Sequence, residues 1–323
     1  MPIARREVLR LGTALAVSSV AAACVRSSPQ ARVAPDPTGR PSAPAGLLPP
    51  AEGSLYFGAS VPYGRSVSAW EQDLGAVLSV HRSYFRSEAD QVGKLVKQCR
   101  VDLLTGRLPH VSIKPGPTWG AVAAGERDDW AVEMLASLDA LAAPAILTVH
   151  HEPENDAGPP GMQPADFVAM QERVIALAAD LAPRVLVVPV LQHWTFDPLR
   201  DDIDPSAWIV PGASAFGVDV YNPWSPGNGK AWRSLGSKLD EVAHWIEGRP
   251  VVIGEYGCRN DPRNPTLGTE WLYDAAEHAR AHGVISMSYF NSGENAPDGS
   301  YVLAGEMESA FAGLLSSPWV ARV

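Results

Sequence analysis

Residues 145–156 read Ala-Ile-Leu-Thr-Val-His-His-Glu-Pro-Glu-Asn-Asp, a mainly apolar run that ends in polar and charged side chains. Residues 250–257 follow the same plan, with Pro-Val-Val-Ile ahead of Gly-Glu-Tyr-Gly. A short apolar run bounded in this way is typical of a buried β-strand. The polar residues then stand at the end of the strand, where side chains are free to do chemistry.

Eight such runs occur from residue 55 onward. They span residues 55–60, 77–84, 110–114, 145–150, 184–191, 215–221, 250–255 and 284–290. The gaps between them leave room for one helix each, and apolar residues at helical spacing predict helices over 87–100, 166–181, 234–247 and 267–282. The gap after the fifth run is irregular.

Strands that alternate with helices pair in parallel, and eight such units predict a single-domain α/β fold, the closed (β/α)₈ or TIM barrel, over residues 52–323. A doubly wound open sheet is the alternative. The barrel is favoured because polar residues recur at the C-terminal ends of the predicted strands, where such barrels build their sites. These residues are His81, Arg82, Lys114, the segments 150–154, 192–194 and 219–222, Glu255, Tyr256 and Asn291.

The composition fits a globular protein, with 323 residues of which 46% are apolar and 19% are charged. The net charge is −10, but residues 1–50 contain six Arg and only two acidic residues. Residues 51–323 therefore carry 20 Lys and Arg against 34 Asp and Glu, a formal charge of −14. A body this acidic disfavours nucleic acid and anionic polymers as partners.

The N-terminus has the pattern of an export signal. Arg5 and Arg6 precede a weakly apolar run over residues 11–23, which is too short for a permanent membrane helix, and the pair resembles the twin-arginine signal. Residues 1–23 are therefore predicted to be a signal peptide, with Cys24 the lipid attachment site of a bacterial lipoprotein. Plain secretion after cleavage at Ala23 is the alternative. The Pro-rich segment 24–51 is predicted to be an extended linker.

The rest of the chain contains two cysteines, Cys99 and Cys258. Cys99 falls inside a predicted helix and Cys258 just beyond a predicted strand, far apart in the order of elements. We expect two buried free thiols. No membrane-spanning helix is predicted after residue 24, so contact with a membrane is expected only through the lipid anchor.

Two strand-end glutamates carry the main functional prediction. Glu152 ends the fourth strand and Glu255 ends the seventh, and these strands face each other across a barrel of eight. Glycosidic cleavage with retention of configuration uses two carboxyl groups about 5 to 5.5 Å apart, one as acid and one as nucleophile. Glu154 competes with Glu152 for the acid role; Glu152 is favoured because strand alternation puts it in phase with Thr148 and His150.

The motifs His151-Glu152-Pro-Glu-Asn155, Asp219-Val-Tyr221 and Gly254-Glu255-Tyr-Gly resemble glycoside hydrolase family 26, over residues 52–318. The resemblance implies a retaining enzyme with Glu152 as acid/base and Glu255 as nucleophile. It places His151 beside the acid/base and has Tyr221, with Asp219 on the same strand, orient the nucleophile. It further implies β-1,4-mannan as the main substrate, with xylan and mixed-linkage glucan as minority substrates. No cofactor or metal is implied, and we expect a monomer.

The chain departs from the family pattern at two places. Pro153 and Glu154 intervene before Asn155, the residue matched to a sugar-binding Asn. The aromatic platform at the top of the eighth strand is usually Trp, and this chain offers Tyr289 or Phe290 there. Further aromatic faces for a sugar are Trp119, Trp194 and Trp224, each of which is as well suited to packing.

Two other functions are compatible with the sequence. A metal-dependent hydrolase on the same barrel would bring together His81, His150, His151, His193 and Asp219 around an ion. A surface lipoprotein that binds glycans without cleaving them would use the same scaffold with no turnover. The presence of both Glu152 and Glu255 favours the hydrolase with two carboxyl groups.

Overall fold

The computed structural model describes residues 50–62, 64–86, 90–261, 263–294 and 299–323. The predicted signal peptide, Cys24 and all of the predicted linker except its last two residues lie outside the described residues. Ser87, where a helix was predicted to begin, lies outside them as well. Among the described residues, no helix has the length and apolar character needed to cross a membrane.

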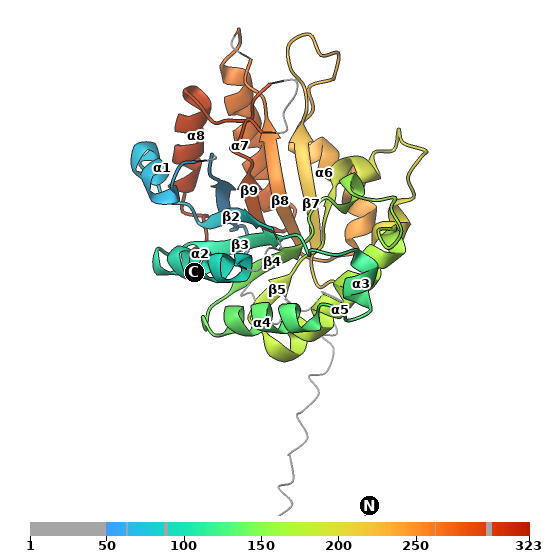
Figure 1. Ribbon diagram of the computed structural model, residues 1–323. Helices are drawn as coiled ribbons and strands as arrows, with labels where there is room; N and C mark the ends of the chain where they lie inside the picture. The colour runs from blue at the N-terminus through green and yellow to red at the C-terminus, as the bar shows by residue number, and fades with distance from the viewer. Residues whose placement is uncertain (1–49, 63, 87–89, 262, 295–298) are drawn as a thin grey trace, which may run out of the picture. The chain divides into compact units, whose positions relative to one another are not determined.

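The strands of the described residues form one curled parallel sheet (Figure 1). They are β1 (Tyr56–Ser60), β2 (Val80–Phe85), β3 (Leu108–Ile113), β4 (Ala145–Val149), β5 (Val185–Val187), β6 (Val190–Gln192), β7 (Phe216–Asn222), β8 (Val251–Cys258) and β9 (Val284–Tyr289). The order in the sheet is β5-β4-β3-β2-β1-β9-β8-β7-β6. Its two ends, β5 and β6, are the halves of the predicted fifth strand, so the sheet closes through the chain itself. The predicted (β/α)₈ barrel is confirmed, and the doubly wound sheet is wrong.

The interruption of the fifth strand has a local cause at Pro189. Val188 still donates its N–H to the Leu147 carbonyl of β4, at 2.9 Å. Pro189 has no N–H to donate and is poorly tolerated inside a sheet. Pairing therefore passes at this residue from β4 on one side to β7 on the other.

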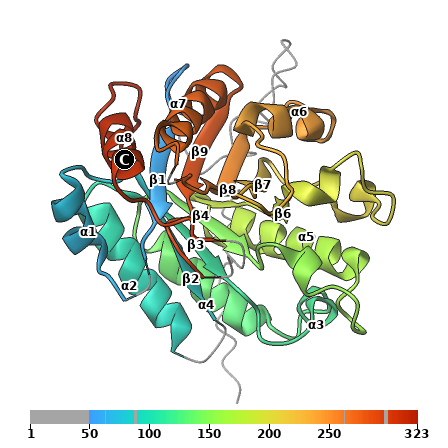
Figure 2. The ribbon, with the colours of Figure 1, turned by 90° about the horizontal axis from the view of Figure 1, so that it is seen from above.

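Helices lie in the gaps between the strands and surround them (Figure 2). They are α1 (Val67–Leu74), α2 (Gln91–Leu104), α3 (Trp119–Ala123), α4 (Asp128–Asp139), α5 (Pro164–Leu181), α6 (Leu235–Ile246), α7 (Thr266–Ala281) and α8 (Glu306–Leu315). Three of the predicted helices match α5, α6 and α7 within two residues, while α2 runs four residues beyond its predicted end. The connection after β6 contains the short 3₁₀ helices His193–Phe196 and Pro205–Trp208 instead of an α-helix, which agrees with the predicted irregular gap.

Several helices begin at a side-chain cap. Ser66, Thr118 and Ser234 each accept a hydrogen bond from the backbone N–H three residues later. A cap of this kind contributes about 1 kcal/mol to helix stability. Helices α1, α3 and α6 therefore start where the sequence supplies a hydroxyl oxygen for an otherwise unpaired N–H.

Apolar residues fill the barrel at the N-terminal ends of its strands and the layer between strands and helices. The inner cluster consists of Tyr56, Val80, Leu108, Ile146, Leu186, Val188, Val190, Ala215, Val252 and Ile285. The outer layer contains Cys99 and Cys258, which are buried free thiols as expected. Along β2 the inward side chains change from Val80 to Arg82 and then Tyr84, because alternate residues of a strand share a face. The interior thus becomes polar toward the C-terminal ends.

Candidate active site

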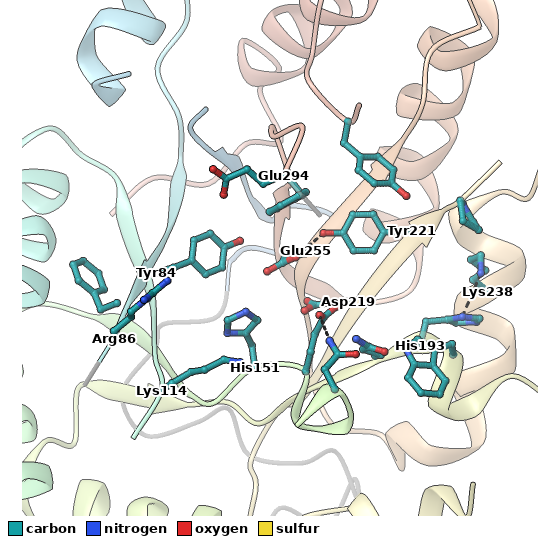
Figure 3. Close-up of a pocket in the computed structure, with 18 of the residues that line it drawn as sticks. Tyr84, Arg86, Lys114, His151, His193, Asp219, Tyr221, Lys238, Glu255 and Glu294 are labelled. Atoms are coloured by element: carbon teal, nitrogen blue, oxygen red, sulfur yellow. Dashed lines mark hydrogen bonds between the residues drawn. The ribbon is translucent and has the colours of Figure 1, made fainter. Parts of the chain in front are cut away.

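A cleft of about 1130 Å³ lies at the C-terminal ends of the strands (Figure 3). Most of the residues predicted from the sequence to bind or cleave a sugar line it. They are Glu152, Glu255, His151, Asn155, Trp194, Asp219 and Tyr221. Trp224 and Tyr289 do not belong to the lining. The cleft is large enough for several sugar units.

Three carboxyl groups meet at the floor of the cleft. One oxygen each of Glu152, Asp219 and Glu255 lies within 4.8 Å of the others. Asp219 and Glu255 are only 2% and 5% exposed. The closest carboxyl oxygens of Glu152 and Glu255 are thus at most 4.8 Å apart. This is shorter than the roughly 6.5–9.5 Å between carboxyl groups that leaves room for a water, and it suits direct attack on a sugar by one of the two groups.

A β-bulge aims Glu255 into the cleft. The register between β7 and β8 shifts after the pair Val218–Ile253, so that Gly254 and Glu255 together face one residue, Asp219. Strict alternation would send Glu255 outward with Ile253. The extra residue of a bulge re-aims the side chains that follow it. Tyr256 consequently packs outward in the helix-facing core, and Glu255 points inward.

The bulge depends on the absence of a side chain at Gly254. A Cβ atom on this residue would lie 2.6 Å from Asp219 Oδ1 and 3.0 Å from a methyl group of Val190. Any larger residue would therefore push the two carboxyl-bearing strands apart. Gly254 allows Asp219 to lie directly beside the backbone that carries Glu255.

Two tyrosines surround the Glu255 carboxylate. The Tyr221 hydroxyl donates a hydrogen bond to Glu255 Oε2 at 2.5 Å, as the resemblance implied. Figure 3 shows the Tyr84 hydroxyl pointing toward Glu255 from the opposite wall. Hydrogen bonds to a carboxylate fix its orientation and favour its ionised form. Tyr84 is a site residue that the sequence analysis missed, although it shares its strand face with Arg82.

Glu152 lies in a turn after β4 and not on the strand. His150 and Glu152 both have left-handed backbones, with φ of 62° and 46°, a conformation that is uncommon for such residues and tends to occur at functional sites. Strand alternation ends with β4 at Val149 and does not extend to Glu152. The argument that preferred Glu152 because it shares a strand face with Thr148 and His150 was therefore wrong. The Glu152 N–H donates to the Val190 carbonyl at 3.0 Å, and Asn155 donates its side-chain amide to Glu152 Oε2 at 2.9 Å.

The surroundings of Glu152 favour its protonated form. Burial, followed by the negative charge of Glu255, raises the pKa of Glu152 to about 7. With this pKa, about half of the Glu152 carboxyl groups carry a proton at pH 7, and more of them do at lower pH. The pair thus offers a proton donor and a neighbouring carboxylate held by Tyr221, which is the division of roles that acid-assisted displacement requires.

The side chain of Glu154, the competing candidate, is held by hydrogen bonds within the protein. Its Oε1 atom accepts hydrogen bonds from the Gln192 N–H at 2.9 Å and the Thr195 hydroxyl at 2.6 Å. Burial raises the pKa of Glu154 to about 7 as well. Its side chain does not line the cleft and instead joins the turn after β4 to the segment after β6. Of the two candidates, Glu152 is therefore the one that lines the cleft beside Glu255.

The histidines do not gather into one metal site among the described residues. His81 contacts Asp102, His150 contacts Asp156, and His193 contacts Glu241. His151 contacts the Ser112 hydroxyl at 2.8 Å, and burial, followed by the charge of Arg82, holds its pKa well below the usual value. Each imidazole thus has a different partner, and the predicted set of four histidines with Asp219 is not assembled.

Arg82 and Asp219 are two buried polar side chains of the barrel interior, close enough for the charge of Arg82 to act on Asp219. The three side-chain nitrogens of Arg82 have no hydrogen-bond partner among the described residues, and the side chains of Arg82 and Asp219 are both nearly inaccessible. Burial and the charge of Glu255 hold the pKa of Asp219 well above its usual value, whereas Arg82 lowers it. Arg82 was noted from the sequence only as a strand-end polar residue. Its shared face with Val80 is the signal that places it inside the barrel.

The prediction for Tyr289 was wrong. This residue is fully buried, and its hydroxyl donates to the Cys258 carbonyl at 3.0 Å. Tyr289 belongs to the outward face of β9, where it packs against Tyr256 and Phe311. The next residue, Phe290, follows the end of the strand and lines the cleft. Phe290 therefore takes the position expected of the aromatic platform.

The tryptophans divide between lining and packing. Trp194 lines the cleft, with the Arg200 guanidinium 3.9 Å from the centre of its ring. Trp224 packs edge-on against Trp232 outside the lining, so its predicted sugar contact is not supported. Trp119 is fully buried and donates its ring N–H to His150 at 2.9 Å. One of the three, Trp194, is available to a ligand.

Comparison with known proteins finds similar folds among solved structures. No protein-family model matches the sequence, and no curated protein matches it. Similar solved structures include XacCel5A in complex with cellopentaose, with a TM-score of 0.58 and 15% identity over 82% of this chain and 99% of that one.

Two further structures carry names related to mannan and to family 26. The exo-β-1,4-mannosidase Op5Man5 from Opitutaceae bacterium strain TAV5 has a TM-score of 0.56 and 15% identity over 84% of this chain and 61% of that one. GH26A from Muricauda sp. MAR_2010_75 has a TM-score of 0.50 and 13% identity over 74% of this chain and 85% of that one. At these identities the likeness establishes the barrel fold that these proteins share with this chain.

Proposed function

We propose that this protein is a retaining β-glycoside hydrolase that works by double displacement. The observation that carries the proposal is the pair Glu152 and Glu255, whose carboxyl oxygens lie within 4.8 Å of each other at the floor of a large cleft. The Tyr221 hydrogen bond to Glu255 and the raised pKa of Glu152 support unequal roles for the two groups. The glycosidases among the similar structures support the same class of reaction.

In the first step, a Glu255 oxygen attacks the anomeric carbon while Glu152 gives its proton to the departing glycosidic oxygen. The bond from carbon to that oxygen breaks, and a glycosyl ester forms on Glu255. In the second step, Glu152 takes a proton from a water molecule, whose oxygen attacks the anomeric carbon and releases the Glu255 carboxylate. Two inversions at one carbon give a product with the original configuration.

We propose a mannan-like β-1,4-linked backbone as the substrate. The motifs around Glu152, Tyr221 and Glu255 support it through their resemblance to family 26, and a mannosidase and a family 26 protein are among the similar structures. Phe290 and Trp194 offer the aromatic faces on which sugar rings stack.

Release of reducing ends from mannan, glucomannan, xylan and mixed-linkage glucan tests the proposal. We expect turnover by the wild type, and none by Glu255→Ala until a small anion such as azide is added. Proton NMR of the first product should show the configuration of the substrate for the wild type and the inverted one for the azide reaction. Early appearance of the opposite anomer from the wild type would refute the assignment of Glu255 as nucleophile.

We also propose that the protein is exported and anchored through Cys24, since Arg5-Arg6, the apolar run and Ala-Ala-Ala-Cys stand in that order. Cys24→Ala should move the protein from the membrane fraction to the medium, and Arg5→Lys combined with Arg6→Lys should block export. Wild-type protein that is already free in the medium would refute the lipid anchor.

A further inference from the structure

The cleft differs in charge from the rest of the molecule. Residues 51–323 have a formal charge of −14, yet five cationic side chains line this one cleft: Arg86, Lys114, Lys230, Lys238 and Arg259. Apart from Glu152, Asp219 and Glu255, Glu294 is the single acidic residue of the lining within the part of the chain that the structure describes. The wall around the carboxyl groups of Glu152, Asp219 and Glu255 therefore carries more positive than negative side chains, in a negative protein.

Three of these cations lack a carboxylate partner. No ion pair forms between Arg86, Lys238 or Arg259 and any acidic residue of the described chain, whereas Lys114 pairs with Asp156 at 2.6 Å. Arginines elsewhere in the molecule are commonly paired, as Arg107 is with Glu71. Among the described residues, the acidic side chains thus leave Arg86, Lys238 and Arg259 without an ion pair, although they outnumber the cations of the chain.

Two of the unpaired cations are also buried. Lys238 is 7% exposed, and its ammonium group contacts the neutral ring nitrogen of His193, at 3.3 Å. Arg259 is 5% exposed and has no acidic partner in the described chain. Its Nη1 atom donates to the Pro223 carbonyl and its guanidinium lies 4.6 Å from the centre of the Tyr301 ring, while its Nε atom is buried without a partner among the described residues. Burial of a charge without an opposite charge is unfavourable, so an anionic group bound in the cleft would relieve this cost. Burial accordingly lowers the pKa of Lys238.

The cations stand on both sides of the reacting pair. Figure 3 shows Arg86 and Lys114 on one side of Glu255 and Lys238 on the other. Arg86 and Lys114 follow β2 and β3, Lys238 belongs to α6, and Arg259 follows β8. A chain bound along the cleft would therefore meet positive charge before and after the bond to be cleaved.

From this arrangement we infer that the substrate is an anionic β-glycan, whose sugars carry acidic groups on both sides of the scissile bond. The inference rests on the proposed glycosidase function and narrows its substrate to a backbone with carboxylate, sulfate or phosphate groups. It differs from the expectation drawn from net charge, which disfavoured anionic polymers, because the net charge of the chain does not describe the charge of the cleft lining. Local charge decides what a cleft attracts.

The test compares matched substrates. The full-length protein is assayed on glucomannan, carboxymethyl-glucomannan and sulfated glucomannan, and on xylan and glucuronoxylan. We expect a higher kcat/KM on the anionic member of a pair, with the preference falling as NaCl rises from about 20 to about 200 mM. The carboxymethyl and sulfated arms distinguish the type of acidic group.

Charge-removing variants tie the preference to the cleft. Arg86→Met and Lys238→Met should each raise KM for the anionic substrate by about tenfold, with a small effect on the neutral one. Lys97→Met, on the exposed surface of α2, is the matched control and should change neither. Arg86 is exposed and pairs with no acidic residue of the described chain, so its variant tests the inference even if Lys238→Met does not fold.

The outcomes separate this inference from the proposed function. Equal turnover of neutral and anionic substrates, unaffected by Arg86→Met, overturns the anionic preference and leaves the hydrolase intact. If no glycan is cleaved, the binding of acidic oligosaccharides to Glu152→Gln is measured by calorimetry. Binding that weakens with added salt and with Arg86→Met would support the anionic preference, although the proposed hydrolase function would be wrong. Absence of such binding overturns the inference.

Discussion

The pKa of Glu152 should fall when the charge of Glu255 is removed. Burial and Glu255 together raise the pKa of Glu152 to about 7, and an oxygen of each group lies within 4.8 Å of the other. A unit charge at this distance contributes about 0.9 kcal/mol in a water-like medium and about 3.5 kcal/mol at an effective dielectric constant near 20. Glu255→Gln should therefore lower the Glu152 pKa by about 0.6 to 2.5 units.

The assay is carbon NMR of protein labelled at the glutamate side-chain carboxyl carbons. The Glu152 signal is identified as the one missing from Glu152→Gln, and its shift is followed between about pH 4 and pH 9. Glu294→Gln is the control, because it removes an exposed carboxylate from the same cleft without contributing to the Glu152 pKa. The Glu152 signal of Glu294→Gln should titrate as it does in the wild type.

The same pKa sets the pH dependence of catalysis. Glu152 is protonated below a pH of about 7 and loses its proton above it, so kcat/KM should decline as the pH rises through this value. An unchanged Glu152 titration in Glu255→Gln would show that burial alone holds the proton. The close approach of the two carboxyl groups, and the double displacement built on it, would then be refuted.

Three further predictions test neighbouring residues. Tyr221→Phe should lower kcat/KM about 10- to 100-fold without lowering Tm, since it removes one hydrogen bond to Glu255; an unaltered rate would exclude an orienting role. For Glu154 the pKa is about 7 in the folded protein and 4.5 for an unperturbed glutamate, so the wild type should lose about 3 kcal/mol of stability as the pH rises from 4.5 to 7. This is the share of Glu154 alone, because the pKa of Glu152 is also about 7. Glu154→Gln should remove that share from the pH dependence of urea unfolding, and the share of Glu152 should remain. Phe290→Ala should raise KM while Tyr289→Phe does not; the reverse would restore Tyr289 as the platform.

The barrel was predictable because its signal is repeated. Eight apolar runs separated by helix-length gaps each identify a strand, and an error of a few residues at one of them does not change the count. The interruption at Pro189 illustrates this robustness, since the fifth run is split into β5 and β6 without loss of the closed order. Strand-end polar residues then had to converge on one rim, because parallel strands all end there.

Side-chain direction was less predictable, because alternation holds only while the backbone stays regular. Tyr289 and Phe290 are neighbours of the same chemical type, and the end of β9 between them decides which one reaches the cleft. The cationic wall was hidden for another reason. Its members come from separate segments of the chain, so no local run of charge marks it in the sequence.

The two glutamates show why irregular backbone occurs where the carboxyl groups meet. A regular strand sends every second side chain into the barrel, and on β8 that rule would place Gly254 inward and Glu255 against the helices. The bulge adds one residue and brings Glu255 inward beside Asp219. After β4, the left-handed residues His150 and Glu152 turn the chain so that the second carboxyl group approaches the first. Both departures from regularity bring the carboxyl groups of Glu152 and Glu255 close together. A Gly254→Ala variant, whose added carbon would lie 2.6 Å from Asp219 Oδ1, should disturb this short separation without changing either glutamate side chain.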